Sequence, residues 1–195
     1  MNKRIIYLLI FVFGFSTFLK SQVFQADIPN PTSIFSMQER SNWCWAASNQ
    51  MLLKSQKIFE TQPNQVKKLF LDSTINRGAG PNFELSKTAL NGTYINSNGD
   101  TLIITPYVSY LWQQNGTDPV IMIQHLQQGI PLIMGTQQHA KVCVGVDYWS
   151  NGTAYQILSF RLLNPVNQYY VEYVSLPEYI KQGLIGFMTM NVTRK

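Results

Sequence analysis

The residues best suited to nucleophilic chemistry are two cysteines, Cys44 and Cys143, and two histidines, His125 and His139. Cys44 begins a stretch without proline or glycine, residues 44–59, in which apolar residues recur at helical spacing. The exposed N–H groups at a helix N-terminus stabilise a thiolate and lower the pKa of a cysteine from about 8.5 toward the reactive range. We therefore predict that Cys44 is a nucleophile in the first turn of a helix.

A thiol nucleophile needs a base, and the chain offers His125 and His139 for this role. His125 lies inside a predicted helix, residues 118–128, and is typical of an ordinary helix-surface residue. His139 follows a glycine-bearing turn and directly precedes a predicted strand, residues 140–148. This position favours His139 as the base.

A third group is expected to hold the imidazole, and the next hairpin indicates which one. The Asn-Gly pair at 151–152 predicts a two-residue type I′ turn, so the numbers of paired residues add to 303. His139 then faces Asn164, with Cβ atoms about 4.5–5.5 Å apart. The rival Asp147 lies eight residues along the His139 strand, about 27 Å away at about 3.3 Å per residue. Asn164 is the predicted partner, and the alternative for it is a plain turn residue.

The alternative for the two cysteines is a structural disulfide, which is common in exported proteins. Cys143 lies four residues beyond His139, about 13 Å along a strand. A Cys44 that contacts His139 cannot also meet the limit of about 7 Å between the Cα atoms of a disulfide. The nucleophile and disulfide hypotheses therefore exclude each other, and we expect Cys143 to be a small core residue.

The elements that must position these residues divide into a helical first half and a strand-rich second half. Helices are predicted over residues 44–59, 64–71 and 118–128, with Thr61 or Asn64 capping the second and Asp118 the third. Loops and short strands are expected over residues 78–106, where turn-forming residues gather. Strands are predicted over residues 130–135, 140–148, 154–163 and 169–174. The pattern predicts one α+β domain, residues 23–195.

The first 22 residues have the layout of a secretory signal peptide: a basic head, an apolar run over residues 5–19 and a polar exit. About 20 apolar residues are needed to span a bilayer, and this run is shorter, so an uncleaved anchor is the weaker alternative. We expect cleavage near residues 21–23, a secreted or periplasmic mature protein, and no stable membrane association afterwards.

The charge balance excludes nucleic acid as a partner. The chain has 15 lysines and arginines against 10 acidic residues, and three of the basic ones (Lys3, Arg4 and Lys20) lie in the leader, which leaves 12 against 10. A net charge of +2 on the remainder gives no basic surface of the kind that binds phosphate backbones. Two histidines and two cysteines, none at ligand spacing, do not form a zinc site, and no cofactor is implied.

The run from Gln38 to Ser48, Gln-Glu-Arg-Ser-Asn-Trp-Cys-Trp-Ala-Ala-Ser, resembles the active-site segment of papain-like cysteine proteases. Its second part is most similar to the bacterial C39-like and AvrRpt2-type peptidases. Downstream, Gly129–Ile133, His139-Ala140 and Val144–Asp147 resemble the histidine block of that family, and Leu163–Pro165 resembles its third block. Here Gln137-Gln138 precedes the histidine, where the family commonly has glycine.

The resemblance implies a papain-like fold, a helical half packed on an antiparallel sheet, and a role for each residue. Cys44 would attack an amide carbonyl, His139 would protonate the leaving amine, and Asn164 would orient His139. Gln38 would donate its side-chain amide, together with the Cys44 backbone N–H, to the oxyanion. The partner would be a peptide or protein substrate.

Three functions follow from these residues. The first is an exported cysteine peptidase. The second is a cysteine-dependent acyl transferase or deamidase on the same scaffold, which would use the same thioester chemistry with another acceptor. The third is a non-catalytic binding module that keeps the fold. The presence of Cys44, His139 and Gln38 together favours the first two over the third.

Overall fold

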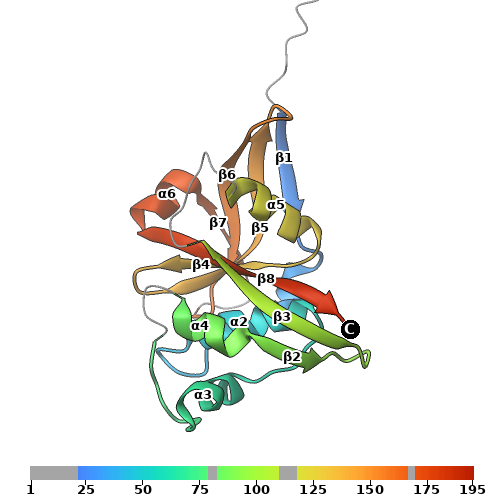
Figure 1. Cartoon of the computed structure of the whole chain (residues 1–195). Helices are drawn as coiled ribbons and strands as arrows, with labels where there is room; N and C mark the ends of the chain where they lie inside the picture. The colour runs from blue at the N-terminus through green and yellow to red at the C-terminus, as the bar shows by residue number, and fades with distance from the viewer. Residues whose placement is uncertain (1–21, 79–82, 110–117, 167–169) are drawn as a thin grey trace, which may run out of the picture.

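In the computed structural model of the chain, the described residues, which are 22–78, 83–109, 118–166 and 170–195, build one eight-stranded sheet (Figure 1). The pairings are antiparallel, and seven strands follow the order β2-β3-β8-β4-β5-β6-β7. The strand bounds are β1 Gln22–Asp27, β2 Gly92–Ile95, β3 Thr101–Ser109, β4 Leu132–Thr136, β5 Ala140–Ser150, β6 Tyr155–Leu163, β7 Val171–Ser175 and β8 Leu184–Arg194.

Strand β5 has two different neighbours along one edge. Its residues 140–143 pair with β4, and its residues 145–150 pair with β1. On the other edge, residues 142–150 pair with β6. The first end of β5, next to β4, is the end that carries His139.

The helices gather in two places (Figure 1). α2, α3 and α4 contact one another at one end of the sheet, and α2 lies against β4 and β5. α5 contacts β1 and the neighbouring strands, whereas α6 contacts β6, β7 and β8. The helix bounds are η1 Pro31–Ile34, α2 Cys44–Ser55, α3 Gln62–Phe70, α4 Glu84–Leu90, α5 Asp118–Gln127 and α6 Leu176–Lys181.

This mixture of helices with an antiparallel sheet agrees with the predicted α+β class, but the sheet takes strands from both halves of the chain. β1, β2 and β3 all precede α5, and the last strand, β8, lies between β3 and β4. No strand was predicted for β1 or β8. The middle of β8, residues 186–190, is buried at every position, so the alternation that identifies a half-exposed strand is absent there.

Helix α2 starts at Cys44 as predicted and ends at Ser55, four residues before the predicted end. Lys57 has a positive φ of 59°, its N–H donates to the Lys54 carbonyl, and the Ile58 N–H donates to the Leu53 carbonyl. These two bonds form a Schellman motif, which satisfies the last carbonyls of the helix and turns the chain away. A lysine in the left-handed conformation gives no sequence signal comparable to glycine.

The other helices agree with the predictions to different degrees. In α3, Thr61 is the cap, since its side chain accepts the Asn64 N–H at 3.3 Å, so the helix begins two residues before the predicted start. α5 begins at Asp118 as predicted and ends at Gln127, one residue before the predicted end and two residues before Gly129 (φ 76°). α4 was missed, and a loop was predicted in its place. It is seven residues long and has no side-chain cap, so its local signal is weak.

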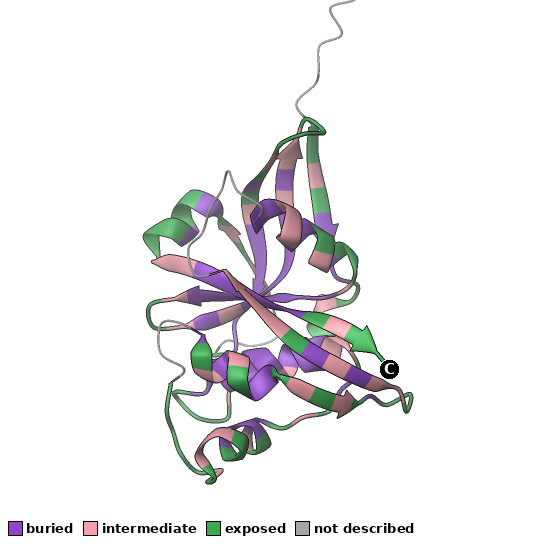
Figure 2. Ribbon diagram, viewed as in Figure 1, coloured by how far each residue is buried: buried purple, intermediate pink, exposed green. Residues whose placement is uncertain are grey.

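The core lies between α2 and the centre of the sheet (Figure 2). On the helix, Met51, Leu52 and Leu53 have no exposed surface, and neither do Leu132 and Val142 on the strands that α2 contacts. Full burial of such side chains contributes about 1.5–3 kcal/mol each. This packing holds α2 against β4 and β5, the two strands on either side of His139.

The predicted leader lies almost entirely outside the described residues, which begin at Gln22, the first residue of β1. Within the part of the chain that is described, no helix has the length and apolar character needed to cross a bilayer.

Candidate active site

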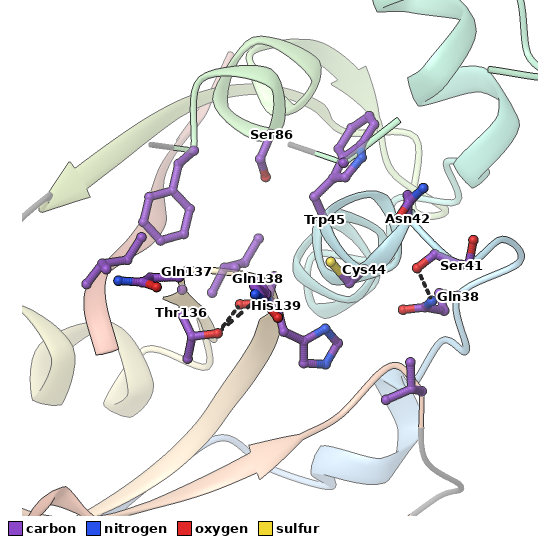
Figure 3. A pocket seen from close by; sticks show the side chains of 17 residues that line it. Gln38, Ser41, Asn42, Cys44, Trp45, Ser86, Thr136, Gln137, Gln138 and His139 are labelled. Carbon is purple, nitrogen blue, oxygen red and sulfur yellow. Dashed lines mark hydrogen bonds between the residues drawn. The ribbon is translucent and has the colours of Figure 1, made fainter. Parts of the chain in front are cut away.

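Cys44 is the first residue of α2, and its side chain lines a pocket of about 310 Å³ (Figure 3). Trp43 occupies the N-cap position and makes no side-chain capping bond to the helix. A cap without a side-chain acceptor leaves the first-turn N–H groups without that partner. Cys44 thus lies at an uncapped helix N-terminus, the positive end of the helix dipole.

The two tryptophans beside Cys44 fix the chain around the pocket. Trp43 Nε1 donates to the Ile75 carbonyl and Trp45 Nε1 to the Arg77 carbonyl, each at 2.9 Å. Both side chains are almost fully buried. They therefore attach the segment around residues 75–77 to the start of α2, and Trp45 also lines the pocket.

Burial raises the pKa of the Cys44 thiol above its ordinary value, although hydrogen bonds with the backbone of Ala140, Trp45 and Cys44 itself act to lower it. This direction corrects the sequence-based expectation of a lowered pKa. The pocket encloses part of the sulfur, and the cost of desolvating a thiolate there exceeds the benefit of the backbone donors. The bond with Ala140 places the sulfur beside the residue that follows His139.

His139 stands in the turn that joins β4 to β5. The Thr136 N–H donates to the His139 carbonyl at 2.9 Å, and the His139 N–H donates to Thr136 Oγ1 at 3.2 Å. The imidazole lines the same pocket as Cys44 (Figure 3). Within the described residues, no hydrogen bond joins the imidazole to the Cys44 sulfur. Desolvation by burial lowers the pKa of His139, while its bond to Asn164 acts to raise it.

The structure brings His139 and Asn164 together: His139 Nε2 lies 2.8 Å from Asn164 Oδ1. The register that predicted this contact is wrong. Ser150 pairs with Tyr155, so paired numbers add to 305, and the loop spans residues 151–154. The Asn151 side chain accepts the Ala154 N–H at 2.8 Å and so organises a four-residue loop in place of the two-residue turn.

The contact survives because of strand geometry. Two irregularities in the β5–β6 register, at 143/145 and 147/148, shift the pairing by one residue and back, so the sum is 305 at both ends. At both ends of the hairpin the net slip is two residues, which keeps the side chains there on their predicted faces, since the side-chain period of a strand is two. His139 and Asn164 thereby become diagonal neighbours, still within reach of each other.

Gln38 lies at the pocket, but its amide is not directed as predicted. Its Nε2 donates to the carbonyls of Arg40 and Ser41, each at 3.0 Å, and its Oε1 is buried and has no hydrogen-bond partner among the described residues. The backbone is well anchored, because the Gln38 N–H donates to the Pro165 carbonyl at 2.9 Å. Donation to an oxyanion would require the amide to release one carbonyl.

The remaining candidates lie outside this group. Cys143 is fully buried and Cys44 is half-buried, and both are free cysteines, so the structure contains no disulfide between them. Burial raises the pKa of Cys143 to about 12. His125 Nδ1 lies 2.9 Å from the Ile121 carbonyl on its own helix. Asp147 pairs with Arg161 at 2.7 Å, farther along β5.

Two charged residues next to Asn164 were missed. Asn164 Nδ2 donates to Glu172 Oε1 at 2.9 Å, and Glu172 Oε2 accepts from Lys141 Nζ at 2.7 Å. Their only signal in the sequence is a charged residue inside each of two predicted strands. Among the described residues, no group of three histidine, cysteine or acidic side chains has the arrangement of a metal site.

Part of the pocket lining is apolar and includes Trp45, Phe83, Ile133 and Ile185. The Phe83 ring lies directly against Gly135, where a Cβ would overlap the ring. The pocket therefore combines an apolar surface with the polar group around Cys44 and His139.

The comparisons with known proteins give a fold and no family. No family model matches the chain, and no curated protein matches it. Among solved structures, it is similar to a Bacillus anthracis protein provisionally named a C39-like peptidase. The TM-score is 0.51 at 12% sequence identity, over 88% of this chain and 100% of the other. The chain thus has a distantly peptidase-like fold, and its resemblance to AvrRpt2-type peptidases stays a prediction.

Proposed function

We propose that the protein is an exported cysteine peptidase with a papain-like arrangement of Cys44, His139 and Asn164. The observation that carries the proposal is the hydrogen bond between His139 and Asn164 at a pocket that also holds Cys44 at an uncapped helix N-terminus. This set of groups supplies a nucleophile, a base and an orienting residue, which acyl transfer from an amide requires. The peptidase-like fold supports the same reaction class.

The uncharged thiol and imidazole are the favoured resting forms, because burial raises the pKa of Cys44 and lowers the pKa of His139. Asn164 occupies Nε2 of the imidazole, which leaves Nδ1 to accept the thiol proton. As the sulfur attacks the substrate carbonyl, its proton moves to Nδ1, and an imidazolium forms beside the tetrahedral intermediate.

The negative oxygen of this intermediate would be stabilised by the N–H groups at the start of α2 and by the Gln38 amide after it rotates. The imidazolium then protonates the leaving amine, and the acyl group remains on Cys44 as a thioester. Water, activated by His139, hydrolyses the thioester and restores the thiol. The apolar part of the pocket lining would accept an apolar side chain of the peptide.

Export rests on the leader. In the sheet, Gln22 pairs with Ser150 as the first residue of β1, so cleavage within the expected range of residues 21–23 would leave β1 complete or nearly complete. We expect the mature chain to be secreted or periplasmic.

The test is hydrolysis of a fluorogenic peptide library by the mature chain, with Cys44→Ala and iodoacetamide treatment as controls. Cleavage that requires Cys44 supports the peptidase. Amine incorporation or ammonia release without cleavage would instead indicate the transferase or deamidase. No Cys44-dependent turnover on any acyl substrate would leave the non-catalytic binding module.

A further inference from the structure

The Asn164 side chain is held from two sides. Its Oδ1 lies 2.8 Å from His139 Nε2 and also accepts the Val166 N–H at 3.2 Å. Its Nδ2 donates to Glu172 Oε1 at 2.9 Å. The other carboxylate oxygen of Glu172 accepts from Lys141 Nζ at 2.7 Å. A continuous chain of polar contacts therefore runs from the imidazole to Lys141.

The pairing of the strands explains why these residues meet. Glu172 pairs with Leu162, and Leu162 pairs with Cys143, which is two residues from Lys141. Side chains alternate between the faces of a sheet, so Lys141 and Glu172 share one face, across the end of β6. His139, two residues before Lys141, belongs to the same face.

The chemistry of an amide makes its orientation important. An asparagine can present either oxygen or nitrogen to a neighbour, and only the oxygen accepts a hydrogen bond from the Nε2–H group of His139. A carboxylate has acceptors alone, so Glu172 requires Nδ2 on its own side. The oxygen then faces His139, Nε2 carries the proton, and Nδ1 remains for the Cys44 thiol.

We propose that Glu172 is a positioning residue that fixes the Asn164 amide in the orientation His139 requires, with Lys141 holding Glu172 in place. The contacts are enclosed: the Lys141 and Glu172 side chains are only 14% and 15% exposed, and Asn164 is 7% exposed. An ion pair this enclosed is screened far less by water than a surface pair. As a catalytic role, the inference rests on the proposed function.

The groups around the imidazole agree with this assignment. Cys44 of α2 lines the same pocket, and the charged residues that act on the imidazole are Lys141 of β5 and Glu172 of β7. Burial is the main cause that lowers the pKa of His139, Lys141 lowers it further, and Glu172 raises it. Because the two charges oppose each other, the pair orients Asn164 without turning His139 into a permanent imidazolium.

The test compares two double variants, Lys141→Met with Glu172→Gln and Lys141→Met with Glu172→Met. Both remove the ion pair, and only the glutamine keeps an acceptor for Asn164 Nδ2. Nitrogen-15 NMR of the imidazoles reads the tautomers directly, and the chain contains its own reference. His125 Nδ1 faces a carbonyl, so His125 should carry its proton on Nδ1, whereas His139 should carry it on Nε2.

We expect the Nε2–H form of His139 in the wild type and in the glutamine variant, and a mixture of tautomers in the methionine variant. For peptide cleavage, kcat of the methionine variant should be about 10-fold below that of the glutamine variant, with KM unchanged. Arg194→Met, which breaks an ion pair between the end of β8 and Asp100 in the turn that joins β2 to β3, should change neither readout. An unchanged His139 tautomer in the methionine variant would overturn the proposal.

A measurement on the wild type covers the case in which the methionine variant does not fold. One Asn164 Nδ2 proton should exchange slowly because Glu172 binds it, and equally fast exchange of both protons would also contradict the proposal. The tautomer readout is independent of turnover. If the wild-type chain cleaved no peptide but the methionine variant still showed the change of tautomer, the peptidase would be refuted and the positioning role retained.

Discussion

The two halves of strand β5 carry two clusters of polar residues with opposite character. The first half, beside β4, leads to the pocket through His139 and Lys141. The second half, beside β1, carries Asp147, which binds Arg161 together with Asp27 from β1. Both clusters contain an ion pair, and both span several strands.

The clusters differ in the charge states that their surroundings favour. Although desolvation opposes both effects, hydrogen bonds and opposite charges lower the pKa of Asp147 and raise the pKa of Arg161, so the charged forms are stabilised. At the pocket beside the first half, burial raises the pKa of Cys44 and lowers the pKa of His139, so the charged forms of these two groups are disfavoured. The surroundings thus stabilise the charged forms of Asp147 and Arg161 and the uncharged forms of Cys44 and His139.

The largest expected effect is on peptide turnover, and it distinguishes Cys44 at the pocket from Cys143 in the core. Cys44→Ala should reduce peptide turnover by at least about 10⁴-fold while leaving the melting temperature within a few degrees of the wild type. Cys143→Ala is the matched control. Its sulfur is enclosed in the core and donates to the Gly145 carbonyl at 3.3 Å, so this change should cost stability and keep kcat. Turnover lost in Cys143→Ala and kept in Cys44→Ala would reverse our assignment.

The next effect concerns stability. Arg161→Met should lower the free energy of unfolding by about 2–4 kcal/mol, because it leaves two carboxylates facing each other without a cation. The Asp27 side chain is 42% exposed, which keeps the loss below that of a fully buried pair.

Urea unfolding measures this change, and Arg194→Met serves as control, since the Arg194 side chain is 68% exposed and its loss should cost less than about 1 kcal/mol. The kcat/KM of folded Arg161→Met should stay within about two-fold of the wild type. A parallel fall in activity would show that the halves of β5 are coupled.

A smaller effect is expected for Asn164→Ala. The change removes the orienting group and leaves the nucleophile and base, so kcat should fall by about 10- to 100-fold and some activity should remain. Asn151→Ala, which weakens the hairpin loop at the far end of β6, should leave kcat unchanged. A wild-type rate for Asn164→Ala would mean that another residue holds His139.

Gln38→Ala should cost less than the loss of a preorganised oxyanion donor, which is typically 10²–10³ in kcat. The amide must first release a carbonyl of Arg40 or Ser41, so part of its stabilisation is spent on that rotation. We expect a loss of about 10-fold in kcat with little change in KM, measured on the best peptide of the library. An unchanged kcat would remove Gln38 from the oxyanion site.

These residues also show which features of the site could be predicted from the sequence alone. The start of α2 at Cys44 and the meeting of His139 with Asn164 were predictable, because helix periodicity and strand alternation are local rules. A shift of the strand register by an even number of residues leaves each side chain on the same face of the sheet. The predicted contact between His139 and Asn164 was therefore right, although the predicted two-residue turn was wrong. The amide of Gln38 was not predictable, because its direction depends on two carbonyls of a loop.

Glu172 and Lys141 show a second limit. Each is one charged residue in a strand, and their contact depends on β6 lying between β5 and β7, which no local pattern specifies. The raised pKa of Cys44 has the same origin: helix position favours the thiolate, and the packing of the pocket, which opposes it more strongly, is known only from the fold. Long-range packing therefore decides the charge states of the site.

The smallest effect is the pH dependence of stability. His139 and Asp147, at the two halves of β5, should affect the free energy of unfolding in different pH ranges. His139 has a lowered pKa in the folded state, so the unfolded chain binds the proton first and stability falls as pH drops from the ordinary value of 6.5. Asp147 also has a lowered pKa, and its contribution is present above the ordinary value of 3.8 and is lost as pH falls from there through the folded value.

Urea unfolding as a function of pH should therefore show two separate decreases. His139→Gln should abolish the decrease that begins near the ordinary histidine pKa, and Asp147→Asn should reduce only the one that begins near the ordinary aspartate pKa. His125→Gln is the control, because it leaves the His139 site intact and should leave the upper decrease in place. If His139→Gln removed no decrease, the imidazole would not be disfavoured in its charged form, and a resting thiolate–imidazolium pair would then be the better description of the pocket.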